Sequence, residues 1–323
     1  MLRVILNPVS RGGRARALRA EIERELARRG VTFDVVETRA PGDATTLARA
    51  ACSAGVHAVI AAGGDGTVHE VANGVLQAQD AGVDNDVAFG IIPTGTGNDF
   101  VKVIPGTATR AAAYDTLAQG DRYPYDAALV RWAGGREYCL NAFGTGVDVE
   151  VVRQIQGRSR RTGALVYLGA LIRALRRYRA VHLRVSADAE LFTEHVMMIA
   201  IGNGTCVGGM FRICPRAVPD DGWLDLCIVR ELGWSRQPAM AARILRGRHI
   251  DHPEVIVRRA RELTIEALDD APLFFQLDGE LREPAGVRRI EVSVQSGRLH
   301  VIAAAVPGSA ASPLPQPEIR RAS

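Results

Sequence analysis

The sequence predicts an α/β protein with an amino-terminal parallel α/β domain and a second domain that is mainly antiparallel and β-rich. Its 323 residues, 47% of them hydrophobic, can bury a sizeable core and are long enough for two domains. Strand and helix patterns alternate over about the first 120 residues, and strand patterns follow one another from about residue 125. These observations together predict the fold class.

The alternation begins with an apolar run at residues 2–6, which reads as a buried strand. A helical periodicity follows at 13–30, with Leu18, Ile22 and Leu26 on one stripe. Strands joined through helices form a parallel sheet, whose ligands bind at the carboxyl ends of the strands. The remaining elements expected in this domain are strands at 31–38, 56–63 and 87–93 and helices at 43–55 and 67–79.

The second domain is expected to begin with a hairpin made by strands 125–132 and 136–144. Further single strands are expected at 181–188, 194–204, 223–232, 255–268, 272–280 and 288–304, with a long helix at 162–179 and a shorter one near 236–247. We therefore divide the chain into a domain of residues 1–124, completed by 299–305, and a domain of residues 125–298. The tail 306–323 is rich in Pro, Ser and Ala, a composition typical of disorder.

Composition limits the function classes. A net charge of +4 and a pI near 9.0, with arginines spread among acidic residues, give no reason to expect a nucleic-acid partner. No GxxxxGK[ST] motif occurs, and Lys102 is the only lysine. The five cysteines form no CxxC pair, and no apolar run is long enough to span a bilayer. We expect a cytoplasmic protein whose membrane contact, if any, is peripheral.

The segment "GGDGTVHE", residues 63–70, follows a buried strand and opens a helix. Backbone N–H groups at such a helix start hold phosphate oxygens, and Gly63, Gly64 and Gly66 permit close approach. The other interpretation is a tight turn in which Asp65 or Thr67 is the N-cap of the helix. The sequence alone leaves both open.

Two more loops follow strand ends of the same sheet. "GIIPTGTGNDF", residues 90–100, carries Thr96, Asn98 and Asp99, which an ordinary Pro-Gly loop does not require. "NPVSRGGRAR", residues 7–16, offers Asn7 and Ser10 as hydrogen-bonding groups, although Ser10 could equally cap the next helix. The candidate phosphate partners here are Arg11, Arg14 and Arg16.

Acidic pairs stand out in the second domain. In "FFQLDGE", Asp278 and Glu280 would lie on one face of a strand, with Gly279 leaving room for a ligand. A solvated strand end is the plainer alternative. Asp220 and Asp221 precede a glycine, as in a common surface turn. Asn141, Gly146 and Asp148 in "NAFGTGVDVE" are equally ambiguous.

Taken in order, "NPVSRGG", "GGDGTVHEV", "PTGTGNDF", "NAFGTGVD", "GNG", "DDGWLD" and "LDGE" resemble the diacylglycerol kinase catalytic-domain family. The resemblance is strongest to its soluble bacterial lipid kinases of the diacylglycerol kinase and YegS-like type, and it runs from Asn7 to about Ala304. It implies a Rossmann-like first domain, a β-rich lipid-binding second domain, and a cleft between them that binds ATP with Mg²⁺.

The resemblance also implies roles for residues at matching positions. Glu280 would accept a proton, with Asp278 beside it, and Asp99 and Asp126 match further acidic positions of the site. A structural Mg²⁺ would use Asp221 with the carbonyls of Val218 and Trp223, and we group Asp126 with these metal positions. The nucleotide contacts would be Asn7, Thr38, Gly64, Asp65, Gly66, Thr67, Val68, His69, Glu70 and Thr96, to which we add Asp99.

The sequence departs from the family pattern in two places. Arg11 and Gly12 stand where glycine and lysine are frequent, and His69 stands where asparagine is commoner. Both departures fall within the variation of the family, so they bear on the roles of single residues more than on the resemblance as a whole.

The implied activity is Mg²⁺-dependent transfer of the γ-phosphoryl group of ATP to a lipid hydroxyl, of diacylglycerol or a related lipid alcohol. The alternatives are an NAD kinase-like enzyme, which shares the GGDGT loop, and a nucleotide-binding regulatory protein without turnover. The apolar segment 163–172, followed by Arg173, Arg176, Arg177 and Arg179, offers peripheral membrane contact, although a core helix with a charged end explains it too. A homodimer is left open.

Overall fold

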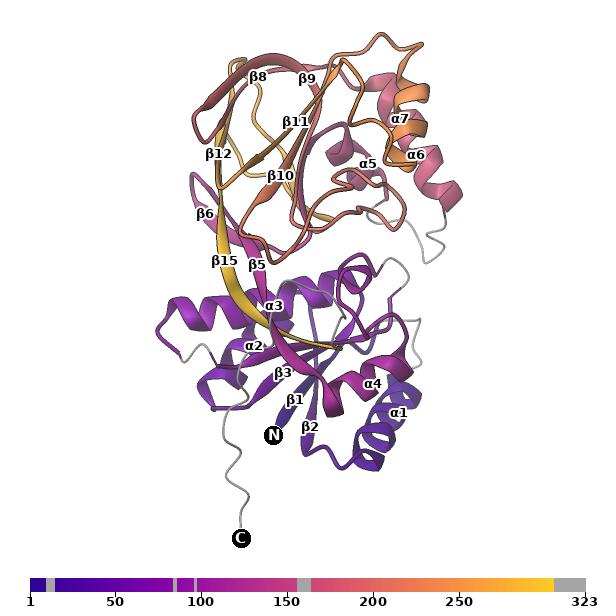
Figure 1. Cartoon of the computed structure of the whole chain (residues 1–323), viewed down its shortest axis with the longest axis vertical. Coiled ribbons are helices and arrows are strands. Elements are labelled where there is room, and N and C mark those ends of the chain that lie inside the picture. The colour runs from indigo at the N-terminus through magenta and orange to yellow at the C-terminus, as the bar shows by residue number, and fades with distance from the viewer. Residues whose placement is uncertain (10–14, 84–85, 96–97, 156–163, 305–323) are drawn as a thin grey trace. The chain divides into compact units, whose positions relative to one another are not determined.

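The computed structural model describes residues 1–9, 15–83, 86–95, 98–155 and 164–304. The chain divides into two compact units (Figure 1). The first unit comprises Met1–Tyr125 and Gly297–Ser323, and the second comprises Asp126–Ser296. The tail that was expected to be disordered lies outside the described residues.

A parallel sheet forms the centre of the first unit, in the order β4-β3-β1-β2. The end of β15 lies beside β4, with Val301 opposite Phe89 in parallel register. Alternate side chains of a strand point to opposite faces, so Val4, Leu6 and Ile60 face one layer of helices while Ile5 and Val59 face the other. The bounds are β1 (Leu2–Leu6), β2 (Phe33–Glu37), β3 (Ala58–Gly63), β4 (Ala88–Pro93) and β15 (Arg289–Ala303).

Helices cover both faces of this sheet, α1 and α4 on one and α2 and α3 on the other (Figure 1). The predicted stripe of α1 is buried against the strands. Helix α4 was not predicted, because its few buried side chains give no extended periodicity; Thr109 begins it by accepting a hydrogen bond from the Ala112 backbone N–H at 3.2 Å. The bounds are α1 (Ala15–Arg28), α2 (Asp43–Ser53), α3 (Asp65–Asp80), η1 (Phe100–Lys102) and α4 (Arg110–Gln119).

The second unit is built on antiparallel strands in the order β14-β13-β7-β9-β8-β12-β15, while β10 pairs with β9 and β11, and β6 pairs with β5. The bounds are β5 (Asp121–Trp132), β6 (Gly135–Cys139), β7 (Ala142–Gly146), β8 (Val181–Ala187), β9 (Glu190–Gly202), β10 (Leu224–Arg230), β11 (Val255–Ala260), β12 (Glu262–Ala267), β13 (Phe275–Leu277) and β14 (Glu280–Arg282).

Two cores form on the two faces of β9 and β10. Ile199 and Ile201 of β9 pack with Leu226 and Ile228 of β10 in a core made mostly by strands. The intervening residues, such as Ala200, face a second core that three helices cover. These are α5 (Val147–Ile155), α6 (Ala164–Arg177) and α7 (Gln237–Leu245). No helix in the described part of the chain is long and apolar enough to cross a membrane.

Three of the predicted strands are wrong in detail. The expected strand 136–144 is interrupted at Leu140 and Asn141, and 255–268 is interrupted at Arg261. The expected strand 272–280 ends at Leu277, where a tight turn begins. Helix α5 was missed because "VDVEVVRQI" is rich in β-branched valine, which favours strands when the sequence is considered alone.

Gly74 on α3 should be required by the packing of α3 against α2. An added Cβ would lie 2.4 Å from the Thr45 carbonyl oxygen and 2.6 Å from the Ala48 Cβ. We expect Gly74→Ala to lower the free energy of unfolding by about 1–3 kcal/mol, as overpacking does. Urea denaturation followed by circular dichroism measures the change.

The matched control is Gly169→Ala on α6, where the added Cβ would meet only the tip of the Arg173 side chain, at 3.4 Å. This variant should be neutral or stabilise by up to about 1 kcal/mol, because alanine restricts the unfolded chain. Equal stability changes in both variants would contradict the packing argument.

Candidate functional site

The first turn of α3 stands at the carboxyl end of β3. Gly64 is the N-cap residue with extended backbone, and it makes no side-chain cap hydrogen bond. The first bond of the helix runs from the Val68 N–H to the Gly64 carbonyl at 3.0 Å, so the N–H groups of the three preceding residues have no acceptor within the helix. Such an end attracts anions. The alternative with Asp65 or Thr67 as N-cap is wrong.

Glycine lets the two candidate loops of this unit touch through their backbones. A Cβ on Gly95 would lie 2.7 Å from the Gly64 Cα, and a Cβ on Gly63 would lie 2.3 Å from the Thr67 side chain. Real side chains do not tolerate such approaches. The ends of β3 and β4 are therefore brought together as the sequence predicted.

Asp65 ties these loops to each other. Its Oδ1 accepts a hydrogen bond from the Asp99 backbone N–H at 2.8 Å, and the Asp99 carboxylate in turn pairs with Lys102 Nζ at 2.8 Å. Asn98, at φ 49°, donates from its amide to the Gly95 carbonyl at 3.1 Å. The carboxylate at the centre of the first glycine loop thus binds a backbone N–H of the second loop, the one that follows β4.

Asn7 and Thr38 lie at adjacent strand ends of this sheet. The Asn7 amide donates to Thr67 Oγ1 at 3.0 Å, which joins the end of β1 to the first turn of α3. The Thr38 N–H donates to the Leu6 carbonyl at 3.0 Å directly after β2. Five expected positions fall outside the described residues: Ser10, Arg11, Arg14, the side chain of Arg16, and Thr96.

The next residues of α3 use their side chains for packing. Val68 is 3% exposed and His69 is 2% exposed. Glu70 accepts a hydrogen bond from the Ala44 N–H at 3.2 Å, in the first turn of α2, and its own carbonyl accepts one from the Thr45 hydroxyl at 3.0 Å. An anion at the start of α3 would therefore meet the backbone of the first turn more than these three side chains.

Asp278 and Gly279 in the second unit form the turn of a two-residue hairpin, with Leu277 opposite Glu280. Their φ values are 53° and 88°, as a type I′ turn requires, and Asp-Gly is a favoured pair for it. The placement of both carboxylates on one strand is therefore wrong. The pattern "LDGE" is a turn signal, and Glu280 begins the next strand.

The Asp278 carboxylate binds the interruption between β6 and β7. It accepts hydrogen bonds from the backbone N–H groups of Leu140, Asn141 and Ala142 at 2.9, 2.8 and 3.1 Å. The Cys139 thiol donates to it at 3.1 Å, and burial raises the pKa of this thiol well above its usual range. The position of the hairpin is thus fixed by three backbone groups of a neighbouring segment.

Glu280 differs from the other carboxylates in this region. It is half-buried, and within the described residues its carboxylate takes part in no hydrogen bond or ion pair. Arg282, two residues further on β14, pairs with Glu137 through contacts of 2.7 and 2.5 Å. Glu137 raises the pKa of Arg282 further, and so do the charges of Glu280 and Asp278. Sequence reasoning missed Arg282, although the period of two from Glu280 could have indicated it.

Asp148 is a second feature that the sequence left ambiguous. It lies in the first turn of α5 against Gly144, where an added Cβ would lie 1.7 Å from its Oδ2. Gln276 donates to that oxygen at 3.4 Å, and its own carbonyl oxygen accepts from the Gly279 N–H at 2.6 Å. Burial raises the pKa of Asp148 to about 7. A titrating carboxyl is therefore linked through one amide side chain to the turn that precedes Glu280.

Asp126 organises a separate acidic turn. It is 1% exposed, and its Oδ2 accepts a hydrogen bond from the Gly222 N–H at 2.7 Å. Asp221 accepts from the Trp223 N–H at 3.0 Å and forms an ion pair with Arg259. The pKa of Asp220 is raised by burial and by the charges of Asp126 and Asp221.

These contacts decide whether the acidic turn suits a metal ion. Among the described residues, no three His, Cys, Asp or Glu side chains form a group that could hold one. An ion bound by Asp221 would depend on backbone carbonyls such as those of Val218 and Trp223, and Arg259 would have to leave the carboxylate. As they stand, these residues do not fit a resident Mg²⁺.

Comparison with known proteins covers nearly the whole described chain. Residues 1–130 match the diacylglycerol kinase catalytic domain, and residues 141–303 match the YegS C-terminal NAD kinase beta sandwich-like domain. A "Probable lipid kinase YegS-like" from Xanthomonas euvesicatoria pv. vesicatoria (strain 85-10) is 32% identical over 280 residues, which is 85% of this chain and 88% of the relative. The diacylglycerol kinase of Bacillus subtilis (strain 168) is 30% identical over 281 residues, 86% and 89% of the two chains.

Solved structures show the same fold. A diacylglycerol kinase from Bacillus anthracis str. Sterne superposes with a TM-score of 0.70 at 20% identity, covering 94% of this chain and 96% of the other. Together with the parallel sheet of the first unit and the antiparallel strands of the second, this confirms the predicted fold class.

The elevated pKa of Asp148 predicts a pH dependence of stability. The unfolded carboxyl has a pKa near 3.8 and the folded one about 7, so the folded protein binds the proton more tightly. The stability contributed by the neutral form is complete below about pH 4 and is lost as the pH rises through about 7, by up to about 4 kcal/mol. Asp148→Asn should remove this loss, which urea denaturation at a series of pH values measures.

The control is Asp270→Asn, because the Asp270 side chain is fully exposed and forms its ion pair with Arg288 at the surface. This variant should keep the pH dependence of the wild type. Asp225, whose pKa burial raises to about 6, contributes a slope of the same sign in all three proteins. Identical slopes in the wild type and Asp148→Asn would show that Asp148 does not titrate in this range.

Proposed function

This chain belongs to the diacylglycerol kinase and YegS-like family of lipid kinases, and we propose that it transfers the γ-phosphoryl group of ATP to the hydroxyl of diacylglycerol or a related lipid alcohol. The oxygen of the lipid hydroxyl forms a bond to the γ-phosphorus, the bond from that phosphorus to the bridging oxygen breaks, and ADP leaves. The hydroxyl proton goes to a carboxylate of the protein.

The observation that carries this proposal is that the Glu280 carboxylate forms no hydrogen bond or ion pair within the described residues. A hydroxyl is a poor nucleophile at neutral pH, and a carboxylate within hydrogen-bond reach can accept its proton as the new bond forms. The carboxylates of Asp65, Asp126, Asp221 and Asp278 accept backbone hydrogen bonds, whereas that of Glu280 has no such partner among the described residues. Glu280 is the carboxylate whose surroundings suit a general base.

Asp278 is proposed as a positioning residue for Glu280. Its carboxylate is held by three backbone N–H groups, so it has little freedom to accept a proton from substrate. Its contribution is the rigidity of the turn that presents Glu280. Arg282 lies on the same side of β14 and supplies positive charge beside the carboxylate.

The nucleotide is proposed to bind at the loops of the first unit. The N–H groups of the first turn of α3 suit phosphate oxygens, and the backbone contact between Gly64 and Gly95 leaves no side chain in the way. Mg²⁺ would arrive with ATP as part of the substrate and neutralise its phosphates. Asn7, Thr38 and Asp99 would surround this position from the neighbouring strand ends.

Contact with a membrane is proposed through α6. Ala170 and Ala174 are buried in the core of the second unit, whereas Ile172 is 45% exposed and Arg173 and Arg176 point to solvent. An exposed face of apolar and cationic side chains suits the surface of a membrane with anionic lipids. The helix therefore has a core face and a separate face that is free to meet lipid.

Glu280→Gln tests the proposed base. Glutamine has nearly the same shape but cannot accept the proton, so kcat with Mg²⁺, ATP and diacylglycerol in mixed micelles should fall by about 10²- to 10⁴-fold. Unfolding by urea should be nearly unchanged, since the carboxylate has no partner to lose. Release of ADP and formation of phosphorylated lipid are measured together.

Glu283→Gln is the matched control, because Glu283 lies just beyond β14 and pairs with Arg153 on the exposed surface. It should retain wild-type turnover. Full activity in Glu280→Gln would exclude Glu280 as the base. Absence of turnover by the wild type with every lipid tested would contradict the kinase proposal, and turnover with NAD as acceptor would identify the NAD kinase-like alternative.

Asp65 gives a second test, because two substitutions separate its charge from its hydrogen bond. Asp65→Asn retains an oxygen that can accept from the Asp99 N–H, while Asp65→Ala removes it. If the charge acts on Mg²⁺ and nucleotide, Asp65→Asn should keep wild-type stability and lose turnover at least about tenfold. Asp65→Ala should also be destabilised, by about 1–3 kcal/mol. Wild-type turnover in Asp65→Asn would reduce Asp65 to a structural tie between loops.

A further inference from the structure

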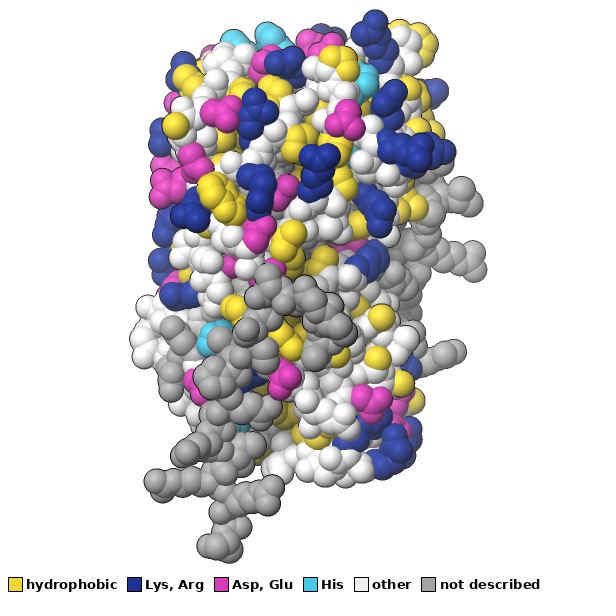
Figure 2. All heavy atoms as spheres, in the orientation of Figure 1, with side chains coloured by type: hydrophobic (Ala, Val, Ile, Leu, Met, Phe, Trp, Pro, Cys, Tyr) yellow, Lys and Arg dark blue, Asp and Glu magenta, His cyan; other side chains and the backbone are white. Residues whose placement is uncertain are grey.

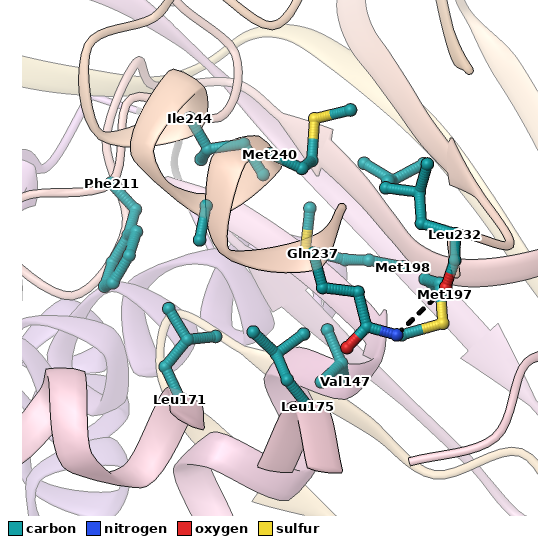
Figure 3. Close-up of a pocket in the computed structure, with 12 residues that line it drawn as sticks. Val147, Leu171, Leu175, Met197, Met198, Phe211, Leu232, Gln237, Met240 and Ile244 are labelled. Carbon is teal, nitrogen blue, oxygen red and sulfur yellow. Dashed lines mark hydrogen bonds between the residues drawn. The ribbon is translucent and has the colours of Figure 1, made fainter. Parts of the chain in front are cut away.

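The second unit contains an apolar pocket between α6, α7 and β9 (Figure 3). Its volume is about 60 Å³. Six of its twelve lining residues come from these three elements in pairs: Leu171 and Leu175 from α6, Met197 and Met198 from β9, and Met240 and Ile244 from α7. In Figure 3 the two leucines point toward α7 from below, and Met197 and Met198 lie to one side, next to Gln237.

A β-bulge explains how two consecutive methionines reach the same pocket. Successive side chains of a regular strand point to opposite faces, so only one of the pair should face the helices. The pairing of β10 with β9 shifts register here: Val229 pairs with Met198, but Arg230 pairs with Val196, and Met197 is left between them. The extra residue turns both thioethers toward the helices. Both belong to the helix-covered core and are at most 5% exposed.

The wall of the pocket favours an apolar occupant. No nitrogen or oxygen atom contributes surface to it. The amide of Gln237, the one polar side chain there, donates to the Leu232 carbonyl at 3.0 Å and is satisfied (Figure 3). A water molecule needs roughly 10–15 Å³ and two to four polar partners, so this space is large enough for water but offers it no partners. Methionine adapts its shape to irregular hydrocarbon groups.

Strand β7 connects this pocket to the hairpin of Glu280 within the same unit. The carbonyl of Ala142, its first residue, accepts a hydrogen bond from the Asp278 N–H at 3.0 Å, and the Ala142 N–H donates to the Asp278 carboxylate at 3.1 Å. Val147, which follows its last residue, lines the pocket. Five residues of extended chain span roughly 16 Å. A ligand that reacts at Glu280 would reach the pocket only with a long apolar extension.

The surroundings of the pocket suit a lipid surface. Leu171 and Leu175 are only half-buried, and Trp234, two residues beyond Leu232, is 83% exposed. Exposed arginines flank both helices, among them Arg173 on α6 and Arg243 on α7. Figure 2 shows such basic side chains, in dark blue, over the part of this unit that carries α6 and α7. Tryptophan and arginine beside an apolar opening are typical of contact with anionic lipid head groups.

We propose that this pocket holds the end of an acyl chain of the lipid substrate while the hydroxyl of that lipid lies beside Glu280. This proposal rests on the proposed function. It adds that the enzyme selects its lipid substrate by the length of the acyl chain. Lipids with long acyl chains bury their ends among the methionines, whereas short-chain lipids react without reaching them. Discrimination by apolar burial increases with each methylene that enters the pocket.

Leu175→Trp tests the pocket by filling it, and Ala241→Leu fills it from α7 with a smaller change that suits a helix. Leu191→Trp is the matched control, since it makes the same substitution at an exposed leucine of β9 that does not line the pocket. The measurement is kcat/KM with Mg²⁺ and ATP for dioleoylglycerol and for dioctanoylglycerol in the same mixed micelles.

The wild type and Leu191→Trp should prefer dioleoylglycerol, and both pocket variants should lose this preference by about tenfold or more while keeping their rate with dioctanoylglycerol. An unchanged preference in both pocket variants would overturn the acyl-chain site and leave the kinase function standing. Equal loss for both lipids would also overturn it.

Binding of the neutral apolar dye N-phenyl-1-naphthylamine tests the pocket without turnover. The dye should fluoresce with the wild type and Leu191→Trp, be displaced by dodecanol, and bind weakly to Leu175→Trp. If no lipid is phosphorylated but the dye behaves in this way, the proposed function fails and the apolar site remains. If the wild type does not bind the dye, the apolar site is overturned.

Discussion

The hydrogen bonds between the Asp278 carboxylate and three consecutive backbone N–H groups fix the hairpin that carries Glu280. Charged acceptors form stronger hydrogen bonds than neutral ones, and buried backbone groups must find partners. The interruption between β6 and β7 would leave these N–H groups without strand partners. Asp278 satisfies them, and in doing so it holds its own turn in a left-handed conformation. The position of Glu280 is a consequence of this arrangement.

The same interaction recurs at two other carboxylates. Asp65 accepts a hydrogen bond from the Asp99 N–H, and Asp126 accepts one from the Gly222 N–H. In each case an acidic side chain fixes a loop that lacks regular hydrogen bonding. Several motif residues that look catalytic in the sequence therefore hold the backbone in place. Their acidity still matters, because their charges act on neighbouring groups such as Asp220.

The sequence predicted the fold class and the meeting of the glycine loops, because hydrophobic periodicity and strand-end glycines are local signals. It did not predict how Asp278 acts: Asp-Gly is a signal for a type I′ turn, but the signal does not show which groups the carboxylate binds. Those groups belong to a backbone segment more than 130 residues earlier in the chain, with separations of 136–138 residues. The elevated pKa of Asp148 comes from its burial in the folded protein, which the local sequence does not show, and the hydrogen bond from Gln276 opposes this rise in part.

Glu280 stands apart once the carboxylates are sorted by their partners. A base must keep its lone pairs available to substrate, and a positioning residue must use them on the protein. Under the proposed function, the hairpin divides these two demands between two acidic residues, because the Asp278 oxygens are already engaged by backbone N–H groups. The turn residue binds the backbone, and the strand residue that follows it is left available. The two residues could not exchange these roles. Asp278, in the turn, is the one that lies beside the interruption between β6 and β7. Glu280, on the strand after the turn, has its direction fixed by that turn.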